Sequence, residues 1–251
     1  MNRFIEEKQR YALTVADQIK GEIYGDECHV LFRDAFYMGD DVLEITYKPR
    51  RFTLLHDYIS YRTRDDFQYV LKKIGSDVYP EIYKEFESFQ VVFQRFENYR
   101  KNNYHEYLYD IYSTQIITSL AHSAFTILFR NRDLMRRFNL NISDEIKKLK
   151  QDEYPLYLKR DGVMKRWTSW PEWLKRGLIK REDGHCAICQ RDQTGVYANS
   201  SSIAIDHIVP LNLGGTNDPT NLQMICADCN GEKGGGKLTT SDKYAPFWLL
   251  E

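Results

Sequence analysis

Four cysteines in the last third of the chain form two Cys-x-x-Cys pairs, Cys186 with Cys189 and Cys226 with Cys229. Four thiolates suit the tetrahedral coordination of structural Zn²⁺, and each pair can bind the ion from one side. A turn-forming run precedes the first pair and a short helix is expected to start at the second, so two local loops separated by 36 residues can meet at one ion. We therefore expect a structural zinc site.

Free thiols or disulfides are the alternative for these cysteines. The start of the chain, Met1 to Lys8, has no apolar segment of the kind that directs secretion, so we expect a cytoplasmic protein with reduced thiols. Cys28, the fifth cysteine, is far from both pairs and is expected to be an ordinary buried thiol. His185 stands beside Cys186, but four thiols already complete a zinc site, so we do not count it as a ligand.

Polar residues that could do chemistry stand between and beside the two pairs. Asp206 and His207 end a short apolar run that predicts a strand, and residues 211–219 are dense in turn formers that would return the chain to the second pair. Asn221 follows that loop, and Asn230 comes directly after the last cysteine. A strand, a loop and a helix would therefore bring these four residues to one place.

These residue types match the needs of phosphodiester cleavage, which requires an activated water and stabilisation of the charge on the phosphate and the leaving oxygen. A neutral imidazole at His207 can accept a proton near pH 7. The carboxylate of Asp206 suits a hard divalent cation such as Mg²⁺. Simpler roles remain open: His207 as a loop cap, Asn221 as a turn residue and Asn230 as an ordinary helix residue.

The segment from about Trp167 to Leu238 resembles the HNH endonuclease family, the ββα-metal nucleases, in the form with a four-cysteine zinc frame. The shared positions are the two Cys-x-x-Cys pairs, Asp206-His207, Pro210, Gly214-Gly215, Asn221-Leu222 and the closing Asn230. The resemblance implies that Asn230, where the family often has its last His, binds the catalytic ion together with Asp206. It also implies that Asn221 orients His207 and its loop.

The resemblance further implies a metal-dependent endonuclease. His207 would activate the water, and the ion at Asp206 and Asn230 would stabilise the departing 3′ oxygen, leaving 5′-phosphate and 3′-hydroxyl ends. An amide ligand favours Mg²⁺ or Mn²⁺ over a softer ion. Double-stranded DNA is the expected substrate, because readout in this family is mostly of backbone and groove shape; RNA stays open.

Basic residues near the zinc loops are candidates for contacts with the nucleic acid backbone. A helix predicted within Trp167–Arg181, with Pro171 at its start, would pack its Trp and Leu side chains on the zinc module and turn its basic face outward. The candidates are Lys175, Arg176, Lys180 and Arg181 on that helix, and Lys233 and Lys237 beside a glycine run. For the last two, contact with phosphate and simple solvation are equally open.

The charge balance argues against tight nucleic acid binding by either part alone. Residues 166–251 carry nine Lys and Arg and ten Asp and Glu, and the whole chain has a net charge of −1. A few phosphate contacts would give weak, salt-sensitive binding. A second element should therefore help: the residues before 166, a homodimer or a partner protein that delivers DNA.

Length and patterning predict an α+β fold with two domains: a mainly helical domain with a small β-hairpin over 1–160, and a zinc-stapled ββα domain over 166–251. The expected elements of the first domain are helices at 3–19, 79–100 and 104–130, a hairpin of 34–37 with 42–47, and a short helix capped by Ser143. A turn at Asp161-Gly162 marks the predicted linker.

The first domain contains aromatic residues at helical spacing, Phe86, Phe89, Phe93 and Phe96, which predict a core more than a base-stacking platform. Its most apolar stretch, 116–129, is too short to span a membrane. Targeting, sensing and partner binding are its candidate roles. By analogy with where such nuclease modules occur, a restriction, phage-defence or mobile-element effector is one setting; a non-catalytic zinc-stabilised binding or adaptor module is the alternative function.

Overall fold

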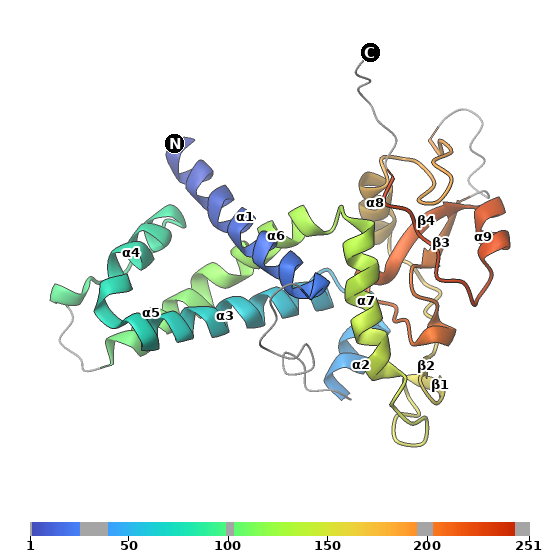
Figure 1. Cartoon of the computed structure of the whole chain (residues 1–251), viewed down its shortest axis with the longest axis horizontal. Helices are drawn as coiled ribbons and strands as arrows, with labels where there is room; N and C mark the ends of the chain where they lie inside the picture. The colour runs from blue at the N-terminus through green and yellow to red at the C-terminus, as the bar shows by residue number, and fades with distance from the viewer. Residues whose placement is uncertain (1, 26–39, 99–102, 195–202, 244–251) are drawn as a thin grey trace, which may run out of the picture. The chain divides into compact units, whose positions relative to one another are not determined.

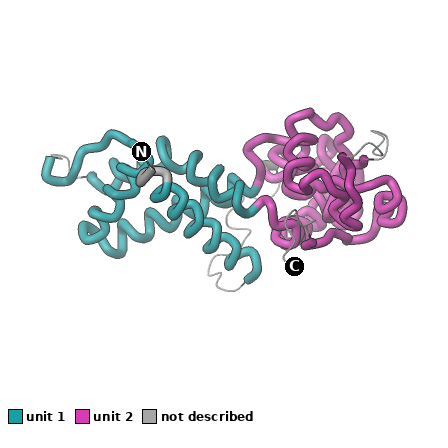
Figure 2. Tube along the Cα trace, turned by 90° about the horizontal axis from the view of Figure 1, so that it is seen from above, with its two compact units in different colours: residues 1–27, 55–128 teal, residues 28–54, 129–251 magenta. Residues whose placement is uncertain are grey.

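A computed structural model describes residues 2–25, 40–98, 103–194 and 203–243. The chain forms two compact units, one of residues 1–27 with 55–128 and one of residues 28–54 with 129–251 (Figure 2). Helices dominate and two two-stranded antiparallel sheets are present, so the predicted α+β class is confirmed (Figure 1). The units divide the chain differently from the predicted domains, because residues 28–54 and 129–160 group with the zinc-loop region.

The first unit consists of helices. They are α1 (Asn2–Tyr24), α3 (Leu54–Ile74, which starts at the unit boundary), α4 (Tyr79–Ser88), α5 (Tyr104–Ile111) and α6 (Ile117–Leu128). Helix α1 packs against α4 and α6. A π-helical turn, Tyr112–Ile116, joins α5 to α6, so the helix predicted over 104–130 is one nearly continuous element that ends at Leu128.

Aromatic rings fill the core of this unit, as the spacing predicted. Phe86 is fully buried, its ring stacks on Phe67, and Phe93 meets it edge-on at 5.3 Å. The predicted helix over 79–100 is wrong beyond Ser88, however. Gln90 has a left-handed backbone (φ 59°), and the N–H of Val91 donates to the carbonyl of Phe86, which turns the chain. The non-helical segment returns along the core, so Phe89 and Phe93 still pack against it, whereas Phe96, also predicted to lie in the core, is 51 % exposed.

The predicted hairpin at 34–47 is corrected for its second half; its first half lies outside the described residues. Residues 42–47 belong to helix α2 (Asp40–Tyr47). Val42, Leu43 and Thr46 are buried at helical spacing, and the Thr46 hydroxyl donates to the carbonyl of Val42 (2.6 Å). A short apolar run does not distinguish strand from helix by periodicity alone.

Helix α7 (Arg132–Ile146) corrects the predicted cap at Ser143. The helix starts after Asn131, whose side chain accepts a hydrogen bond from the N–H of Leu134 (2.9 Å). Ser143 lies inside the helix and its hydroxyl donates to the carbonyl of Leu140 (2.8 Å). Residues that favour caps also occur within helices when their side chains bond the preceding turn.

The second unit contains a strand, loop, strand and helix in sequence. Strand β3 (Ile203–His207) pairs antiparallel with β4 (Leu222–Cys226), in register from Ile203 opposite Cys226 to His207 opposite Leu222. Two 3₁₀ turns, Leu211–Leu213 and Pro219–Asn221, interrupt the loop between them, and α9 (Ala227–Lys233) follows. This is the ββα order that the sequence predicted.

A second small sheet precedes that frame. Strands β1 (Leu158–Arg160) and β2 (Val163–Met164) form a hairpin whose turn is Asp161-Gly162. The turn predicted as a linker therefore lies within the second unit.

Helix α8 (Glu172–Arg181) covers the β3–β4 sheet. Pro171 caps its start, and Leu174 and Leu178 pack on Leu222 and Met224. The Trp170 and Trp173 side chains complete this cluster, as predicted. The apolar face of α8 therefore packs against the sheet whose strand β3 ends at His207.

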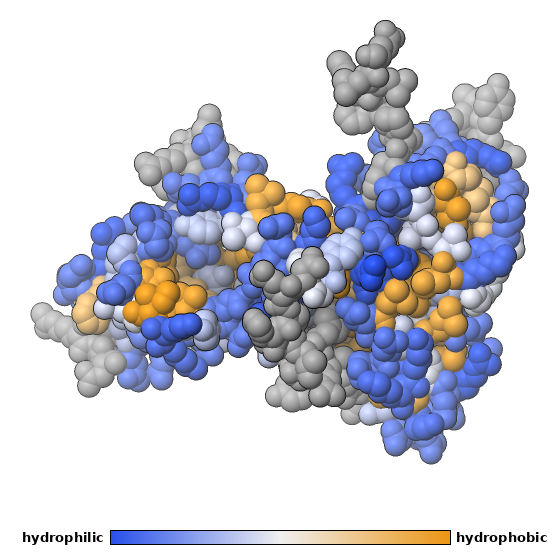
Figure 3. Space-filling model, viewed as in Figure 1, coloured by the Kyte–Doolittle hydropathy of each residue, from blue (hydrophilic) through white to orange (hydrophobic). Residues whose placement is uncertain are grey.

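The exterior is mixed in character. Figure 3 shows hydrophilic residues over most of the visible face, with apolar patches over both units. Among the described residues, no helix is long and apolar enough to cross a membrane.

The loop between β3 and β4 leaves no room for a side chain at Gly215. A Cβ there would lie 1.9 Å from the carbonyl oxygen of Val209, a backbone atom that cannot move without opening the loop. We predict that Gly215→Ala lowers the free energy of unfolding by about 2 to 4 kcal/mol. Gly236→Ala is the matched control, because a Cβ there meets nothing within 4 Å. Equal denaturation midpoints for the two variants would refute the prediction.

Candidate metal centre and active site

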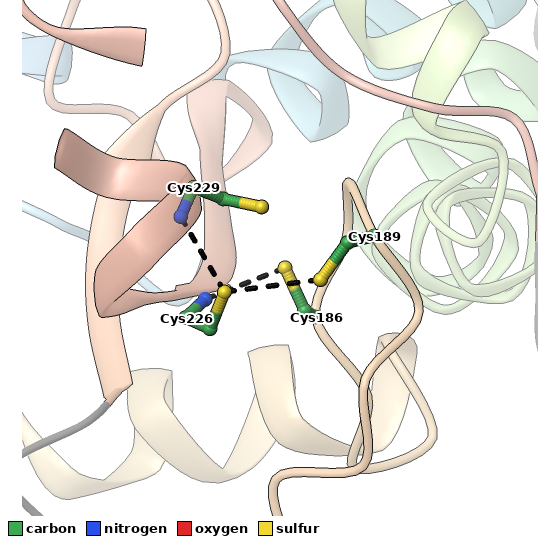
Figure 4. Close-up of side chains that lie close together, drawn as sticks. All are labelled: Cys186, Cys189, Cys226 and Cys229. Carbon is green, nitrogen blue, oxygen red and sulfur yellow. Dashed lines mark hydrogen bonds between the residues drawn. The ribbon is translucent and has the colours of Figure 1, made fainter. Parts of the chain in front are cut away.

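The four predicted zinc ligands converge on one point. Cys186 and Cys189, from the loop after α8, face Cys226 and Cys229 at the start of α9 (Figure 4). All four sulfur atoms lie within 4.8 Å of one another, and those of Cys189 and Cys226 are 3.8 Å apart. A tetrahedron with Zn–S bonds of about 2.3 Å has edges of about 3.8 Å, whereas a disulfide is about 2.05 Å long. The donor set therefore fits zinc and not a disulfide.

Backbone groups position these thiols. The N–H of Cys226 donates to the sulfur of Cys186 (3.3 Å), and the N–H of Cys229 donates to the sulfur of Cys226 (3.5 Å). The N–H of Ala187 donates to the carbonyl of Met224, which joins the first loop to β4. Burial raises the pKa of Cys186, but N–H donors from Cys189, Cys226 and neighbouring Ile188 outweigh it and lower the pKa to about 7. These donors favour the thiolate that zinc requires.

His207 ends strand β3 and is 2 % exposed. Its Nε2 lies 3.1 Å from Oδ1 of Asn217. The Asn217 amide nitrogen donates to the carbonyls of Tyr47 and Lys165, both at 3.0 Å, while the N–H of Trp167 donates to Oδ1 (3.1 Å). These three bonds fix the oxygen of Asn217 toward the imidazole.

The tautomer of His207 follows from this arrangement. An amide oxygen only accepts hydrogen bonds, so Nε2 carries the proton and Nδ1 carries the lone pair. Nδ1 is buried and has no hydrogen-bond partner among the described residues. Trp170 packs on the ring at 6.0 Å between centroids. The protein thus presents a basic nitrogen that none of its described groups satisfies.

Burial controls the charge of this imidazole. Desolvation lowers the pKa of His207 from 6.5 to about 4; the hydrogen bond that the ring donates to Asn217 opposes the shift, and the nearby charge of Arg166 adds to it. His207 is therefore neutral at pH 7 and able to accept a proton.

Asp206 has one carboxylate oxygen engaged and one free. Its Oδ2 accepts hydrogen bonds from Gln223 (2.9 Å) and from the ammonium of Lys233 (2.5 Å). Its Oδ1 has no hydrogen bond among the described residues. Lys233, predicted as a surface contact for nucleic acid, is 4 % exposed and also donates to the carbonyl of His207. That prediction is corrected: Lys233 is a buried ion-pair partner, and burial lowers its pKa despite Asp206.

Asn230 lies on α9, one turn before Lys233, and is exposed. Its side chain makes no hydrogen bond to the described part of the chain. Helix α9 packs against β3, the strand that carries Asp206. An amide and a carboxylate oxygen that make no hydrogen bond to the described residues, on adjoining elements, are the ligand types that a hard divalent cation such as Mg²⁺ or Mn²⁺ prefers.

Asn221 is completely buried and closes the loop between the strands. Its amide nitrogen donates to the carbonyls of Val209 (2.9 Å) and Thr216 (2.8 Å), and its oxygen accepts from the N–H of Val209 (2.8 Å). These bonds hold the loop, whereas the imidazole of His207 donates its hydrogen bond to Asn217. Sequence reasoning missed Asn217, because Asn before Asp-Pro is a common turn residue and gives no signal of its own.

The predicted basic face of α8 is smaller than expected. Lys175, Arg176 and Lys180 are exposed, and Lys175 pairs with Glu172 (2.6 Å). Arg181, also predicted to be outside, is 3 % exposed: it pairs with Glu182 and donates to the carbonyl of Leu222 (2.5 Å). Glu182 also pairs with the buried Arg132, so it is shared between two guanidinium groups, and the guanidinium of Arg181 lies 4.6 Å from the ring centroid of Phe129.

Lys237 is the last candidate. It is exposed, and its ammonium caps the carbonyl of Glu232 (2.9 Å) near the end of α9.

Comparison with protein families supports the resemblance. Residues 186–236 match the family model for HNH endonuclease, a span that runs from the first zinc ligand past α9. The predicted resemblance is confirmed over this span. No curated protein and no solved structure matches the chain.

We predict that Cys189→Ser reduces zinc content from one ion per chain to near zero and lowers the midpoint of thermal unfolding by on the order of 10 °C. Cys189 is exposed, so the loss would come from the missing ligand and not from packing. His185→Ala, beside the first ligand, should keep its zinc. Retention of stoichiometric zinc by Cys189→Ser, measured by metal analysis, would contradict a four-thiol site.

The protonation of His207 can be measured by NMR of its imidazole nitrogens. We predict the Nε2–H tautomer at pH 7 and a titration midpoint near pH 4. Because the unfolded imidazole titrates near 6.5, the unfolded chain binds more protons between these values. His207 therefore contributes stability above pH 6.5 that is lost as the pH falls toward 4. A midpoint near 6.5, or a proton on Nδ1, would count against the geometry.

Proposed function

We propose that the second unit is a metal-dependent endonuclease that hydrolyses phosphodiester bonds in double-stranded DNA. The observation that carries the proposal is the buried, neutral imidazole of His207, whose Nδ1 lone pair has no partner in the described structure. It lies beside Asp206 on a zinc-loop frame, within a segment that matches the HNH endonuclease model.

The proton transfer follows from the tautomer. Nδ1 of His207 takes a proton from water as the water oxygen bonds to phosphorus and the bond to the 3′ oxygen breaks, and the departing 3′ oxygen takes a proton from solvent water. The imidazolium formed in this step keeps its Nε2–H on the oxygen of Asn217, which stabilises the positive charge. Asn217 thereby holds the ring in place before and after the transfer. The products would carry 5′-phosphate and 3′-hydroxyl ends.

Asp206 and Asn230 would hold the Mg²⁺ or Mn²⁺ ion. When bound, that ion supplies positive charge for the leaving 3′ oxygen. The ammonium of Lys233 pairs with the other oxygen of Asp206. Gln223 and Lys233 thus hold one oxygen of Asp206, and the other oxygen would be available to bind the metal ion.

The alternative function is a zinc-stabilised adaptor without catalysis. An adaptor would need the four cysteines and Asn221. It would not need a buried imidazole nitrogen at His207 without a hydrogen-bond partner, beside a carboxylate at Asp206 with one oxygen available to a metal ion. Buried polar atoms without partners are costly, and they persist mainly where a ligand or a reaction uses them. This cost favours catalysis. A setting in restriction, phage defence or a mobile element rests on the resemblance alone.

The test is cleavage of supercoiled plasmid with Mg²⁺ or Mn²⁺. We predict that His207→Ala lowers the rate by about 10² to 10⁴-fold, the usual contribution of a general base, while zinc content stays at one ion per chain. Asn230→Ala, an exposed change, should need more metal for the same rate. Glu232→Ala, also exposed on α9, is its matched control.

The outcomes separate the two functions. Cleavage by wild type and not by zinc-loaded His207→Ala supports the nuclease. Equal cleavage by both excludes His207 as the base. No cleavage by fully zinc-loaded wild type on duplex DNA, single-stranded DNA or RNA favours the adaptor.

A further inference from the structure

A basic segment far from the zinc loops in sequence lies beside the candidate active site. Residues 48–51 follow α2 and read Lys-Pro-Arg-Arg. Lys48, Arg50 and Arg51 are all exposed. The segment belongs to the second unit, although it precedes α8 by more than a hundred residues. The sequence alone gave no reason to associate it with His207.

Both ends of this segment are attached to the residues that support His207. The carbonyl of Tyr47 accepts the Asn217 amide (3.0 Å), and Asn217 itself bonds the imidazole. Beyond the segment, the N–H of Leu54 donates to the carboxylate of Asp218 (2.9 Å). Both ends of the basic segment are therefore tied to the loop that carries Asn217, the residue bonded to the imidazole of His207.

Two tryptophans hold the basic side chains in place. The ammonium of Lys48 lies 5.3 Å from the ring centroid of Trp167, and the guanidinium of Arg51 lies 5.2 Å from that of Trp173. Such contacts restrict long side chains without neutralising them. No ion pair with a carboxylate is found for Lys48, Arg50 or Arg51 among the described residues, although the charge of Arg50 acts on the buried carboxyl of Asp218 and opposes the rise of its pKa on burial.

Arg166 adds a fourth positive charge. It is exposed and lies between Lys165 and Trp167, whose backbone groups both bond Asn217. Its charge is close enough to His207 to contribute to lowering the pKa of that imidazole. Residues 48–51 and Arg166, from two separate stretches of the chain, thus both place positive charge near Asn217, the residue that bonds the imidazole of His207.

We propose that Lys48, Arg50, Arg51 and Arg166 form a binding surface for the phosphate backbone of DNA that holds the duplex beside His207. This proposal rests on the proposed function for its link to cleavage, but binding can be measured without cleavage. Four exposed cations without an ion pair to the described residues, two of them held against tryptophan rings, match a polyanion with evenly spaced charges. The predicted face of α8 is a weaker candidate, because Arg181 is buried and Lys175 is paired.

The experiment measures binding of a fluorescent DNA duplex by anisotropy over a range of salt concentrations, in the His207→Ala background so that no cutting occurs. Replacing Lys48, Arg50 and Arg51 with Gln should weaken binding about tenfold near 0.1 M salt. The slope of log K against log salt should become shallower by about 2 to 3, because each lost phosphate contact contributes about 0.9.

A control triple removes the same charge elsewhere in the same unit. Lys147, Lys148 and Lys150 are exposed and already paired with Asp144, Glu145 and Asp161. Changing all three to Gln should leave affinity and slope nearly unchanged. An equal effect of the two triples, or no effect of either, would overturn the proposed surface.

Cleavage kinetics separate this proposal from the proposed function. In the wild-type background the Lys48/Arg50/Arg51 triple should raise KM with little change in kcat, since backbone contacts bind substrate and transition state alike. A selective loss of binding, together with a wild type that never cuts, would keep the surface and reject the nuclease. Normal cleavage with an unchanged KM in the triple would keep the nuclease and reject the surface.

Discussion

The candidate site depends on the hydrogen bonds made by the side-chain amide of Asn217. Its nitrogen satisfies two backbone carbonyls, so its oxygen has one orientation, and that oxygen fixes the proton of His207 on Nε2. Without this bond the buried imidazole could carry its proton on either nitrogen, and the ring could flip about the bond that joins it to Cβ. One amide therefore determines which nitrogen is basic. It also joins β3 to Tyr47 and Lys165, segments outside the zinc-loop motif.

The rest of the second unit holds the amide of Asn217 and the imidazole of His207 in position relative to each other. The zinc site would join the loop after α8 to the start of α9, and Asn221 closes the intervening loop through three hydrogen bonds. Gly215 permits the close approach that Asn221 needs, since any side chain there would collide with Val209. The zinc site, the loop and the pairing of β3 with β4 thus stabilise different parts of the ββα structure. Each joins residues close enough in sequence that the entropy cost of closing the loop between them is modest.

The sequence predicted the parts of this frame that depend on local spacing. Cysteine pairs, the β-loop-β-helix order and the packing of α8 follow from short-range patterns. It did not predict the burial of Arg181 and Lys233, because that burial depends on contacts between distant parts of the chain. Lys233 pairs with Asp206, 27 residues away, and Arg181, although next to Glu182 in the sequence, is buried where it donates to the carbonyl of Leu222. For the same reason it could not place Lys48–Arg51 beside His207: those bonds join residues about 170 apart.

Net charge is a poor guide to where such a protein would bind DNA. The chain as a whole is nearly neutral, yet charges more than about 10 Å apart act independently at moderate salt. What a phosphate meets is the local set of cations, and their effect depends on whether carboxylates already pair with them. On α8, one predicted cation is buried and another is paired, whereas Lys48, Arg50 and Arg51 are exposed and unpaired among the described residues. The proposed surface at Lys48, Arg50, Arg51 and Arg166 would thus supply, from the same compact unit, the second element that a weakly charged zinc module requires.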